Sequence, residues 1–150
     1  MKGLFHLQSP KQLLEKLRHD FVRLKEDQVD VYAAFDFFVT ARHMPEWLYP
    51  GDTNKQKALW DAQVLLRVCR HIADGSKHFR VTGAQHDTVK DLSNRGGVFQ
   101  PGVFQSNVFQ VGKLFVELDG DAITSLGTDI EVVALAGRIL EFWEVHPDLR

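Results

Sequence analysis

The sequence predicts an α+β protein: a helical bundle of about four helices with a small antiparallel β-meander between the third and the last helix. Apolar residues recur at helical spacing through most of the first half and again near the end, whereas the region between them holds short strand-like runs separated by glycine-containing turns. The chain has 150 residues, a common size for one domain, and no stretch resembles a linker. We therefore expect a single domain over residues 1–150.

The composition is that of a folded globular protein. Hydrophobic residues make up 44% and charged residues 25% of the chain, and the formal net charge is −2. This charge argues against a strongly basic nucleic-acid surface but leaves a local basic patch open. The single cysteine, Cys69, excludes an intramolecular disulfide and a multi-cysteine zinc site, and its apolar surroundings predict a buried, inert thiol.

No membrane association is expected, and the predicted location is the cytoplasm. The longest apolar stretch, Val31–Ala41, is interrupted by Asp36 and is far shorter than the ~20 residues that a membrane helix needs. Leu4–Leu7 is too short and too polar for the core of a signal peptide.

Three helices are expected in the first half. Ser9 and Pro10 predict the start of the first, because serine caps free amides and proline fits the first turn. The second is apolar around most of its circumference, which predicts a central position. Pro45 and Pro50–Asn54 predict a loop, and Asp74-Gly75 predicts the end of the third helix, with continuation through Lys77 left open. The expected helices are Ser9-Pro10 to Glu26, Val29 to His43 or Trp47, and Gln56–Ala73.

Strands and one closing helix are expected in the second half. The expected strands are Phe79–Val81, Val98–Phe104, Val108–Leu118 and Ala122–Leu126. Asn94–Gly97 and Asp119–Asp121 predict turns. The closing helix is expected over Asp129–Val145, with Thr128 or Asp129 as its cap.

A Val-Phe-Gln unit occurs three times, starting at Val98, Val103 and Val108, and no charged residue lies between Gly96 and Gly112. Such a segment fits a hydrophobic strand edge laid on the helices, or an edge that binds a partner. Because native edge strands are normally guarded by charges, we predict a homodimer formed partly through Val98–Leu118.

Two expected helices each carry a polar stripe. Asp36, Thr40, His43 and Trp47 are spaced four, three and four residues apart, which places them on one helix face. The second stripe has the same alternation and consists of Trp60, Val64, Arg67, His71, Asp74 and His78. Burying an ionisable group destabilises a fold unless the group is paired. A polar stripe on a core helix therefore indicates a structural or functional role for its residues.

One interpretation is structural or ligand-binding. In an antiparallel helix hairpin, Asp36 would pair with Arg67 and His71, while Asp36, Thr40 and His43 could contact a small polar ligand. A metal site is not expected, because His43 and His71 would lie about 15 Å apart along the axis. His71 and His78 would lie about 10 Å apart on a continuous helix. No cofactor motif is present either.

The alternative interpretation is metal-independent acid–base chemistry on a phosphodiester. His71 or His78 would act as the base and Asp74 would orient it, since histidine titrates near neutral pH. Arg67 or Lys77 would stabilise charge on the phosphate. RNA is the possible partner on this interpretation.

The segments Thr40-Ala-Arg-His43 and Cys69–Phe79 resemble a family of uncharacterised bacterial proteins with a T-x-x-H…A-[ND]-G-x-K-H-F signature. This resemblance implies no particular activity. A looser likeness, to the HEPN group of helical proteins, implies ribonuclease chemistry. The chain departs from the HEPN signature, because Arg67 precedes His71 by four residues and Arg70 precedes His78 by eight.

Two functional hypotheses follow. The first is a non-catalytic interaction or regulatory domain, and the second is a HEPN-like ribonuclease of a toxin or defence system. Local pairing of Arg67, His71 and His78 would favour the first, whereas a deep cleft holding His71, Lys77 and His78 together would favour the second.

Overall fold

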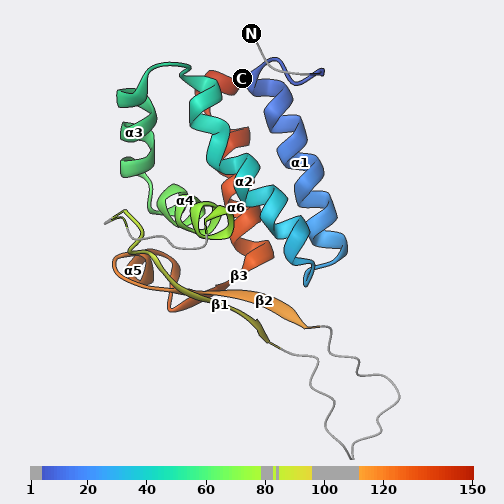
Figure 1. Cartoon of the computed structure of the whole chain (residues 1–150), viewed down its shortest axis with the longest axis vertical. Coiled ribbons are helices and arrows are strands. Elements are labelled where there is room, and N and C mark those ends of the chain that lie inside the picture. The colour runs from blue at the N-terminus through green and yellow to red at the C-terminus, as the bar shows by residue number, and fades with distance from the viewer. Residues whose placement is uncertain (1–4, 79–82, 84, 96–111) are drawn as a thin grey trace, which may run out of the picture.

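The structure, a computed structural model, describes residues 5–78, 83, 85–95 and 112–150 (Figure 1). Helices form one layer and a three-stranded antiparallel sheet lies against it, which confirms the α+β class. The described elements are α1 (Pro10–Glu26), α2 (Val31–Leu48), α3 (Thr53–Ala62), α4 (Val64–Lys77), β1 (Val89–Arg95), β2 (Lys113–Leu118), α5 (Ala122–Leu126), β3 (Asp129–Glu131), α6 (Val132–Glu144) and a 3-10 turn (Pro147–Leu149).

The first two helices follow the predictions closely. Ser9 caps α1, since its hydroxyl accepts a hydrogen bond from the Gln12 amide at 3.3 Å. The Asp30 carboxylate caps α2 by accepting from the amides of Tyr32 and Ala33. The predicted loop at Pro45 is wrong, because α2 continues to Leu48. A proline in the penultimate turn removes one amide donor, but its carbonyl still accepts from the Tyr49 amide at 3.0 Å.

The predicted third helix, Gln56–Ala73, is two helices. Gln63 adopts an extended conformation, with φ −130° and ψ 113°, and its carbonyl accepts the first hydrogen bonds of α4. No glycine or proline marks this break. It lets α4 run in a different direction from α3 and cross beneath α2 (Figure 1). α4 then continues through the predicted Asp74-Gly75 stop to Lys77.

The sheet has the order β1-β2-β3, with both neighbouring pairs antiparallel. In β2 every second residue is buried, because Leu114, Val116 and Leu118 face the helices. β1 was not predicted, since its sequence Val-Lys-Asp-Leu-Ser-Asn-Arg lacks an alternating apolar pattern. Its last residues occupy part of the turn predicted at Asn94–Gly97.

Two predictions near the end of the chain are wrong. Ala122–Leu126 is the helix α5 and not a strand, and Gly127, with φ +90°, ends it. A run of only five residues, Ala-Ile-Thr-Ser-Leu, is too short for periodicity to distinguish a helix from a strand. The closing helix starts at Val132 rather than Asp129, because Asp129–Glu131 pairs with β2 and buries Ile130. Neither Thr128 nor Asp129 is therefore its cap.

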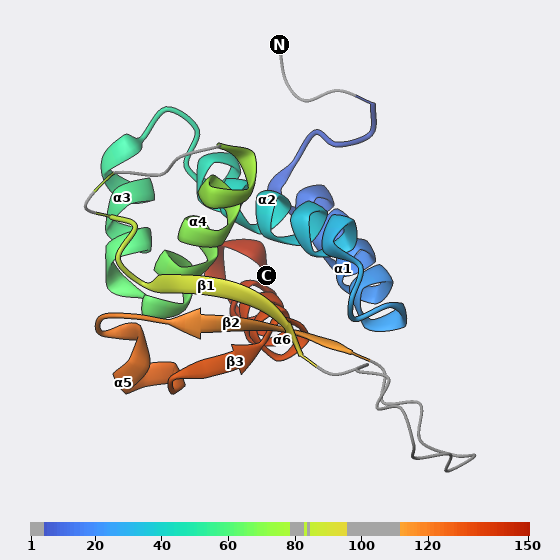
Figure 2. The ribbon, with the colours of Figure 1, turned by 60° about the horizontal axis from the view of Figure 1, so that its bottom comes forward.

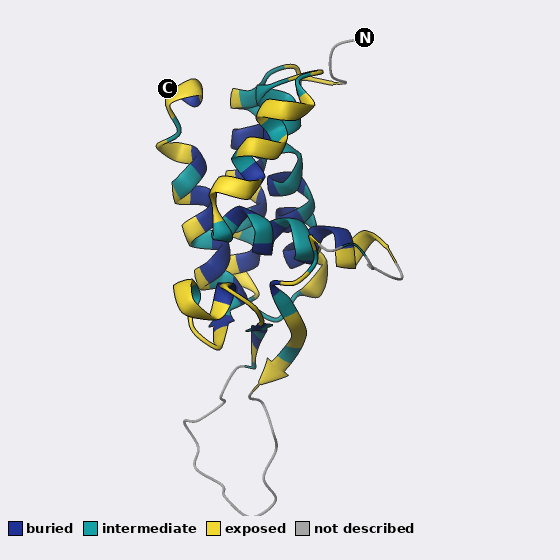
Figure 3. Cartoon of the chain, turned by 90° about the vertical axis from the view of Figure 1, so that its left-hand side faces the viewer, coloured by how far each residue is buried: buried dark blue, intermediate teal, exposed yellow. Residues whose placement is uncertain are grey.

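The core lies where α1, α2, α4 and α6 meet the inner face of β2 (Figure 3). α2 is the central helix, as predicted, and it packs against α1, α3, α4 and α6. Trp60 and Trp143 are buried, while Trp47 is partly buried against the same cluster. Cys69 is fully buried, and burial raises the pKa of its thiol.

Several predictions lie outside the described residues. They are the strands Phe79–Val81 and Val98–Phe104, the three Val-Phe-Gln units, and the first part of Val108–Leu118. The remainder of that last strand is confirmed as β2. Of the helices in the described ranges, none combines the length and apolar character needed to cross a bilayer.

Candidate functional site

The polar stripe of α2 faces several neighbours instead of one site. Asp36 pairs with Arg23 of α1 at 2.8 Å, so the predicted Asp36–Arg67–His71 pairing is wrong. Thr40 donates to the buried Asp20 carboxylate at 2.8 Å, and Lys16 reaches both. Asp36 and Thr40 lie on the side of α2 that packs along α1. Their polar side chains are therefore paired with residues of α1 and not with residues of α4. We find no convergent ligand site among Asp36, Thr40 and His43.

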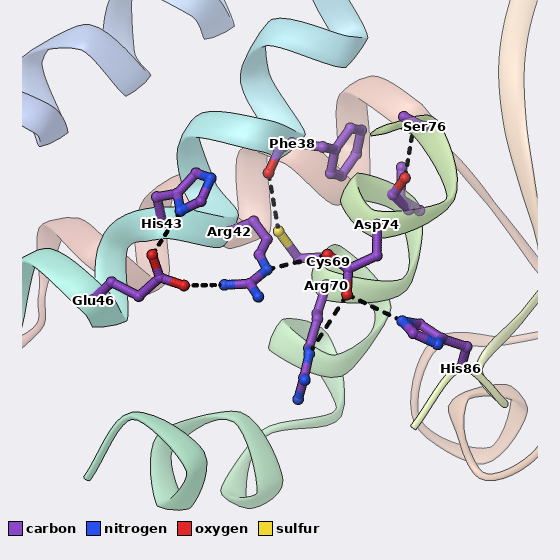
Figure 4. A network of polar contacts seen from close by, with 10 residues as sticks. Phe38, Arg42, His43, Glu46, Cys69, Arg70, Asp74, Ser76 and His86 are labelled. Carbon is purple, nitrogen blue, oxygen red and sulfur yellow. Dashed lines mark hydrogen bonds and ion pairs between the residues drawn. The ribbon is translucent and has the colours of Figure 1, made fainter. Parts of the chain in front are cut away.

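The polar stripe of α4 is aligned as predicted, but its members also have separate partners. Arg67 donates through Nη2 to Asp121 at the start of α5, at 2.5 Å. This hydrogen bond raises the pKa of Arg67 and lowers that of Asp121. Asp74 instead contacts Arg42 of α2 and His86 of the segment that precedes β1 (Figure 4).

Asp74 is the centre of a polar network, which consists of His43, Glu46, Arg42, Asp74, Arg70 and His86 (Figure 4). Its carboxylate accepts from Arg42 Nε at 3.2 Å and contacts His86 Nε2 at 3.0 Å. Arg70 Nε lies 3.7 Å from the same carboxylate. Burial alone would raise the pKa of Asp74, but the His86 hydrogen bond and the Arg42 charge outweigh burial and lower it.

The network continues along α2. Arg42 donates through Nη1 to Glu46 at 2.5 Å, and the other carboxylate oxygen of Glu46 contacts His43 Nδ1 at 2.8 Å. Burial would raise the pKa of Glu46, but these two contacts lower it. The guanidinium carbons of Arg42 and Arg70 lie 5.5 and 6.0 Å from the ring centre of buried Trp60, within cation–π range. The network therefore joins α2, α3, α4 and the start of the sheet.

His71 connects α4 to β1. Its Nδ1 lies 3.0 Å from the Val89 amide nitrogen and 3.3 Å from the Thr88 amide nitrogen. Amide nitrogens only donate, so Nδ1 is an unprotonated acceptor and the neutral ring carries its hydrogen on Nε2. Burial, followed by the nearby charge of His86, lowers the pKa of His71. The lone pair that a general base would use is thus already occupied.

Two nitrogens near this histidine make no hydrogen bond to any described residue, although one of them lies within ion-pair distance of Asp74. They are His86 Nδ1 and Arg70 Nε, both buried. The rings of His71 and His86 are tilted against each other, with centroids 5.2 Å apart. No three potential metal ligands come together in the part of the chain that the structure describes. The pair therefore packs and hydrogen-bonds without forming a recognisable metal cluster in this part of the chain.

Lys77 and His78 lie apart from His71. Lys77 is the last residue of α4, and the His78 amide closes the helix by donating to the Asp74 carbonyl at 2.9 Å. Both side chains are exposed. The five residues proposed for catalysis are therefore distributed over the length of α4 instead of facing one point.

Of the network residues, the sequence predictions missed Arg42, Glu46, Arg70 and His86. The first two carried a signal, because opposite charges four residues apart pair on a helix. The same spacing relates Arg70 to Asp74. No local pattern indicates His86, which reaches Asp74 through the path of the chain between α4 and β1.

An apolar hollow of about 310 Å³ lies between α2, α4 and the sheet. Its walls come from the first half of α2, from Ile72 and Ser76 of α4, and from β1 and Leu114 of β2. None of Arg67, His71, Lys77 and His78 lines it. A second, more polar hollow of about 440 Å³ lies beside Lys90, Glu117 and Asp129 and also excludes these four residues.

No protein-family model, curated protein or solved structure matches this chain. The likeness to the bacterial family with the Thr40–His43 motif, and the weaker one to HEPN proteins, therefore stay predictions. Any function must be argued from the geometry described above.

Proposed function

We propose that this protein is a non-catalytic interaction or regulatory domain of the cytoplasm, in which the polar network orders the fold. The observation that supports this most directly is the local engagement of the candidate catalytic side chains. Arg67 pairs with Asp121, and His71 accepts amides of β1. General acid–base chemistry needs such groups within hydrogen-bond reach of one substrate atom.

The binding surface of this domain is the rim of the apolar hollow. Val31 is 57%, Tyr32 78%, Phe35 38% and Leu92 46% exposed, and three of these four line the hollow directly. Single exposed apolar side chains are common, but a group of them beside a concave apolar surface marks an interaction site. The sequence also predicts self-association through Val98–Leu118, most of which lies outside the described residues.

The competing hypothesis is a HEPN-like ribonuclease that uses Arg67, His71, Asp74, Lys77 and His78. Incubating the purified native chain with total RNA, beside His71→Ala and His78→Ala variants, separates the two proposals. We expect no cleavage above the buffer blank from any of the three proteins. His78 is exposed and forms no described side-chain hydrogen bond, so His78→Ala tests chemistry without disturbing the fold.

Cleavage by the native chain that is lost in His78→Ala, or in a His71→Ala protein with a native circular dichroism spectrum, would overturn the non-catalytic proposal. Cleavage that is equal in all three samples indicates a contaminating nuclease, because neither histidine then contributes.

A further inference from the structure

β1 is an edge strand. It pairs with β2 on one side, and no described strand pairs with its other side (Figure 2). An edge strand presents unpaired backbone groups and is a ready template for another strand. α4 protects only its beginning, where His71 accepts the amides of Thr88 and Val89. Along the rest of this edge no strand of the described ranges is paired, which leaves room for a partner strand.

The backbone groups that point off this edge can be assigned. The Leu92 amide donates to the side chain of Asp91 at 2.8 Å, so it does not donate to β2. In an antiparallel pair the residues alternate between those bonded to the partner strand and those directed away from it. Leu92 and Asn94 therefore direct their amide and carbonyl groups outward. Among the described residues, the acceptor of the Leu92 amide is the neighbouring Asp91 side chain.

The middle of this edge is apolar. Leu92 is on the helix-facing side of β1, opposite Val116, yet it is 46% exposed. It lies at the hollow together with Val31 and Phe35 of α2. A strand that docks on the edge would cover Leu92, and one of its carbonyls would replace Asp91 as the acceptor for the Leu92 amide. Hydrogen bonding and apolar burial thus favour the same position.

We propose that the occupant of this edge is a second copy of the chain, whose own β1 pairs antiparallel with the first about Leu92. Leu92 of one copy then lies opposite Leu92 of the other, Lys90 opposite Asn94, and Asp91 opposite Ser93. The result is one sheet of six strands across two copies. This inference rests on the proposal that the rim of the hollow is a binding surface, and names its partner.

The charges of β1 suit this register. No pair of directly opposite residues has the same sign. Asp91 of one copy lies diagonal to both Arg95 and Asp91 of the other, so one diagonal contact is attractive and one is repulsive. A register centred on Lys90 would instead place two lysines opposite each other, which is unfavourable. The register centred on Leu92 thus avoids like charges at directly opposite positions, whereas the register centred on Lys90 does not. The proposed contact is formed by β1, which precedes the segment Val98–Leu118 in the sequence. It is therefore a different contact from the predicted association through that segment.

The test is disulfide trapping of the full-length protein. In the proposed register two Leu92→Cys side chains meet at the two-fold axis, within the ~7 Å Cα separation that a disulfide tolerates. Two Lys90→Cys side chains are four residues out of register, about 13 Å apart along the strand. Under mild oxidation we expect most of the Leu92→Cys protein to become a covalent dimer and Lys90→Cys to give traces. Native Cys69 is buried and contributes no background.

A mixture of Lys90→Cys and Asn94→Cys chains keeps the test independent of Leu92 itself. Those positions are opposite in the proposed register, so we expect the mixed disulfide to dominate over either homodimer in mass spectrometry. Equal cross-linking of Leu92→Cys and Lys90→Cys, or none in either, overturns the proposal. So does loss of the Leu92→Cys dimer on adding Phe104→Lys, because self-association would then run through Val98–Leu118.

The two proposals fail separately. Absent cross-linking with no RNA cleavage rejects the β1 pairing but leaves a non-catalytic domain. Histidine-dependent RNA cleavage rejects that domain, whatever the disulfides show.

Discussion

At the scale of single residues, His71 shows how a titratable group can be structural. Its Nδ1 accepts hydrogen bonds from the amides of Thr88 and Val89, so α4 is joined to the start of β1. The ring can accept these bonds only while Nδ1 is unprotonated. His86, Asp74 and Asp87 are the charged or titratable neighbours that influence the His71 pKa. Burial and the charge of His86 lower this pKa, which favours the accepting form.

The His71 contact predicts that stability falls on mild acidification. Because the folded-state pKa of His71 is lower than its usual value of about 6.5, the unfolded chain binds more protons below that pH. The free energy of unfolding should therefore decrease as pH falls from 7 to 5, by less than about 1 kcal/mol for this partly exposed ring. Urea denaturation at several pH values measures the slope.

His71→Gln should reduce this slope, because the glutamine carbonyl accepts amide hydrogen bonds without titrating. His19→Gln, on the exposed face of α1, is the matched control and should keep the native slope. Identical slopes in His71→Gln and the native chain would show that His71 does not couple folding to pH in this range.

At the scale of elements, packing decides where helices end. Gln63 interrupts what reads as one continuous helix, and the break allows Trp60 to lie near Arg42 and Arg70 while α4 crosses α2. The residues predicted as the first turn of the last helix form β3 instead, because Ile130 is buried as a strand residue beside Val116. In both places local sequence allows two structures, and tertiary contact selects one.

The docking of α6 predicts a large effect of Trp143. Its side chain is fully buried, with its ring packed edge-on to Phe142 at 4.9 Å. Trp143→Ala should lower the free energy of unfolding by about 3–5 kcal/mol, the usual cost of deleting a buried aromatic side chain. Chemical denaturation followed by circular dichroism measures this cost.

Trp143→Phe retains most of the ring volume and should cost less. Val145→Ala, at a position 53% exposed just beyond α6, should change stability by no more than about 0.5 kcal/mol. An unchanged denaturation midpoint in Trp143→Ala would mean that α6 does not dock through this ring.

At the scale of the whole molecule, the polar and apolar surfaces have different roles. The polar network lies between elements, and most of its groups pair with one another, whereas three exposed apolar residues, Val31, Phe35 and Leu92, line the hollow beside the outer edge of β1. Such a distribution is suited to association, because the energy available to a partner comes from uncovered apolar area and unpaired backbone groups.

Self-association makes the mass and the thermal stability depend on concentration. Light scattering after size exclusion at tens of micromolar should give about twice the chain mass of 17.1 kDa. Tm should rise with protein concentration, since dilution releases the less stable monomer. Leu92→Lys should yield a monomer with an unchanged circular dichroism spectrum, because Leu92 is not part of the core. A native chain of monomeric mass, with Tm independent of concentration, would contradict this expectation.

The sequence by itself determined the fold class, the position of the first helix and the central role of α2. These follow from local rules: apolar spacing, the Ser9-Pro10 start and the apolar residues that cover most of the circumference of α2. It also aligned Arg67, His71 and Asp74 on one face of α4, because helical geometry depends only on residue spacing.

Only the tertiary structure decided what those side chains touch. Asp36 meets Arg23 instead of Arg67, and Asp74 is bound by Arg42 of α2 and by His86, which lies before β1. It also decided that the polar segment Val89–Arg95 is a strand. The segment has no alternating apolar pattern, and backbone hydrogen bonds to β2 stabilise its extended conformation. Partners of this kind are chosen by the relative placement of elements distant in sequence, and no local spacing contains that information.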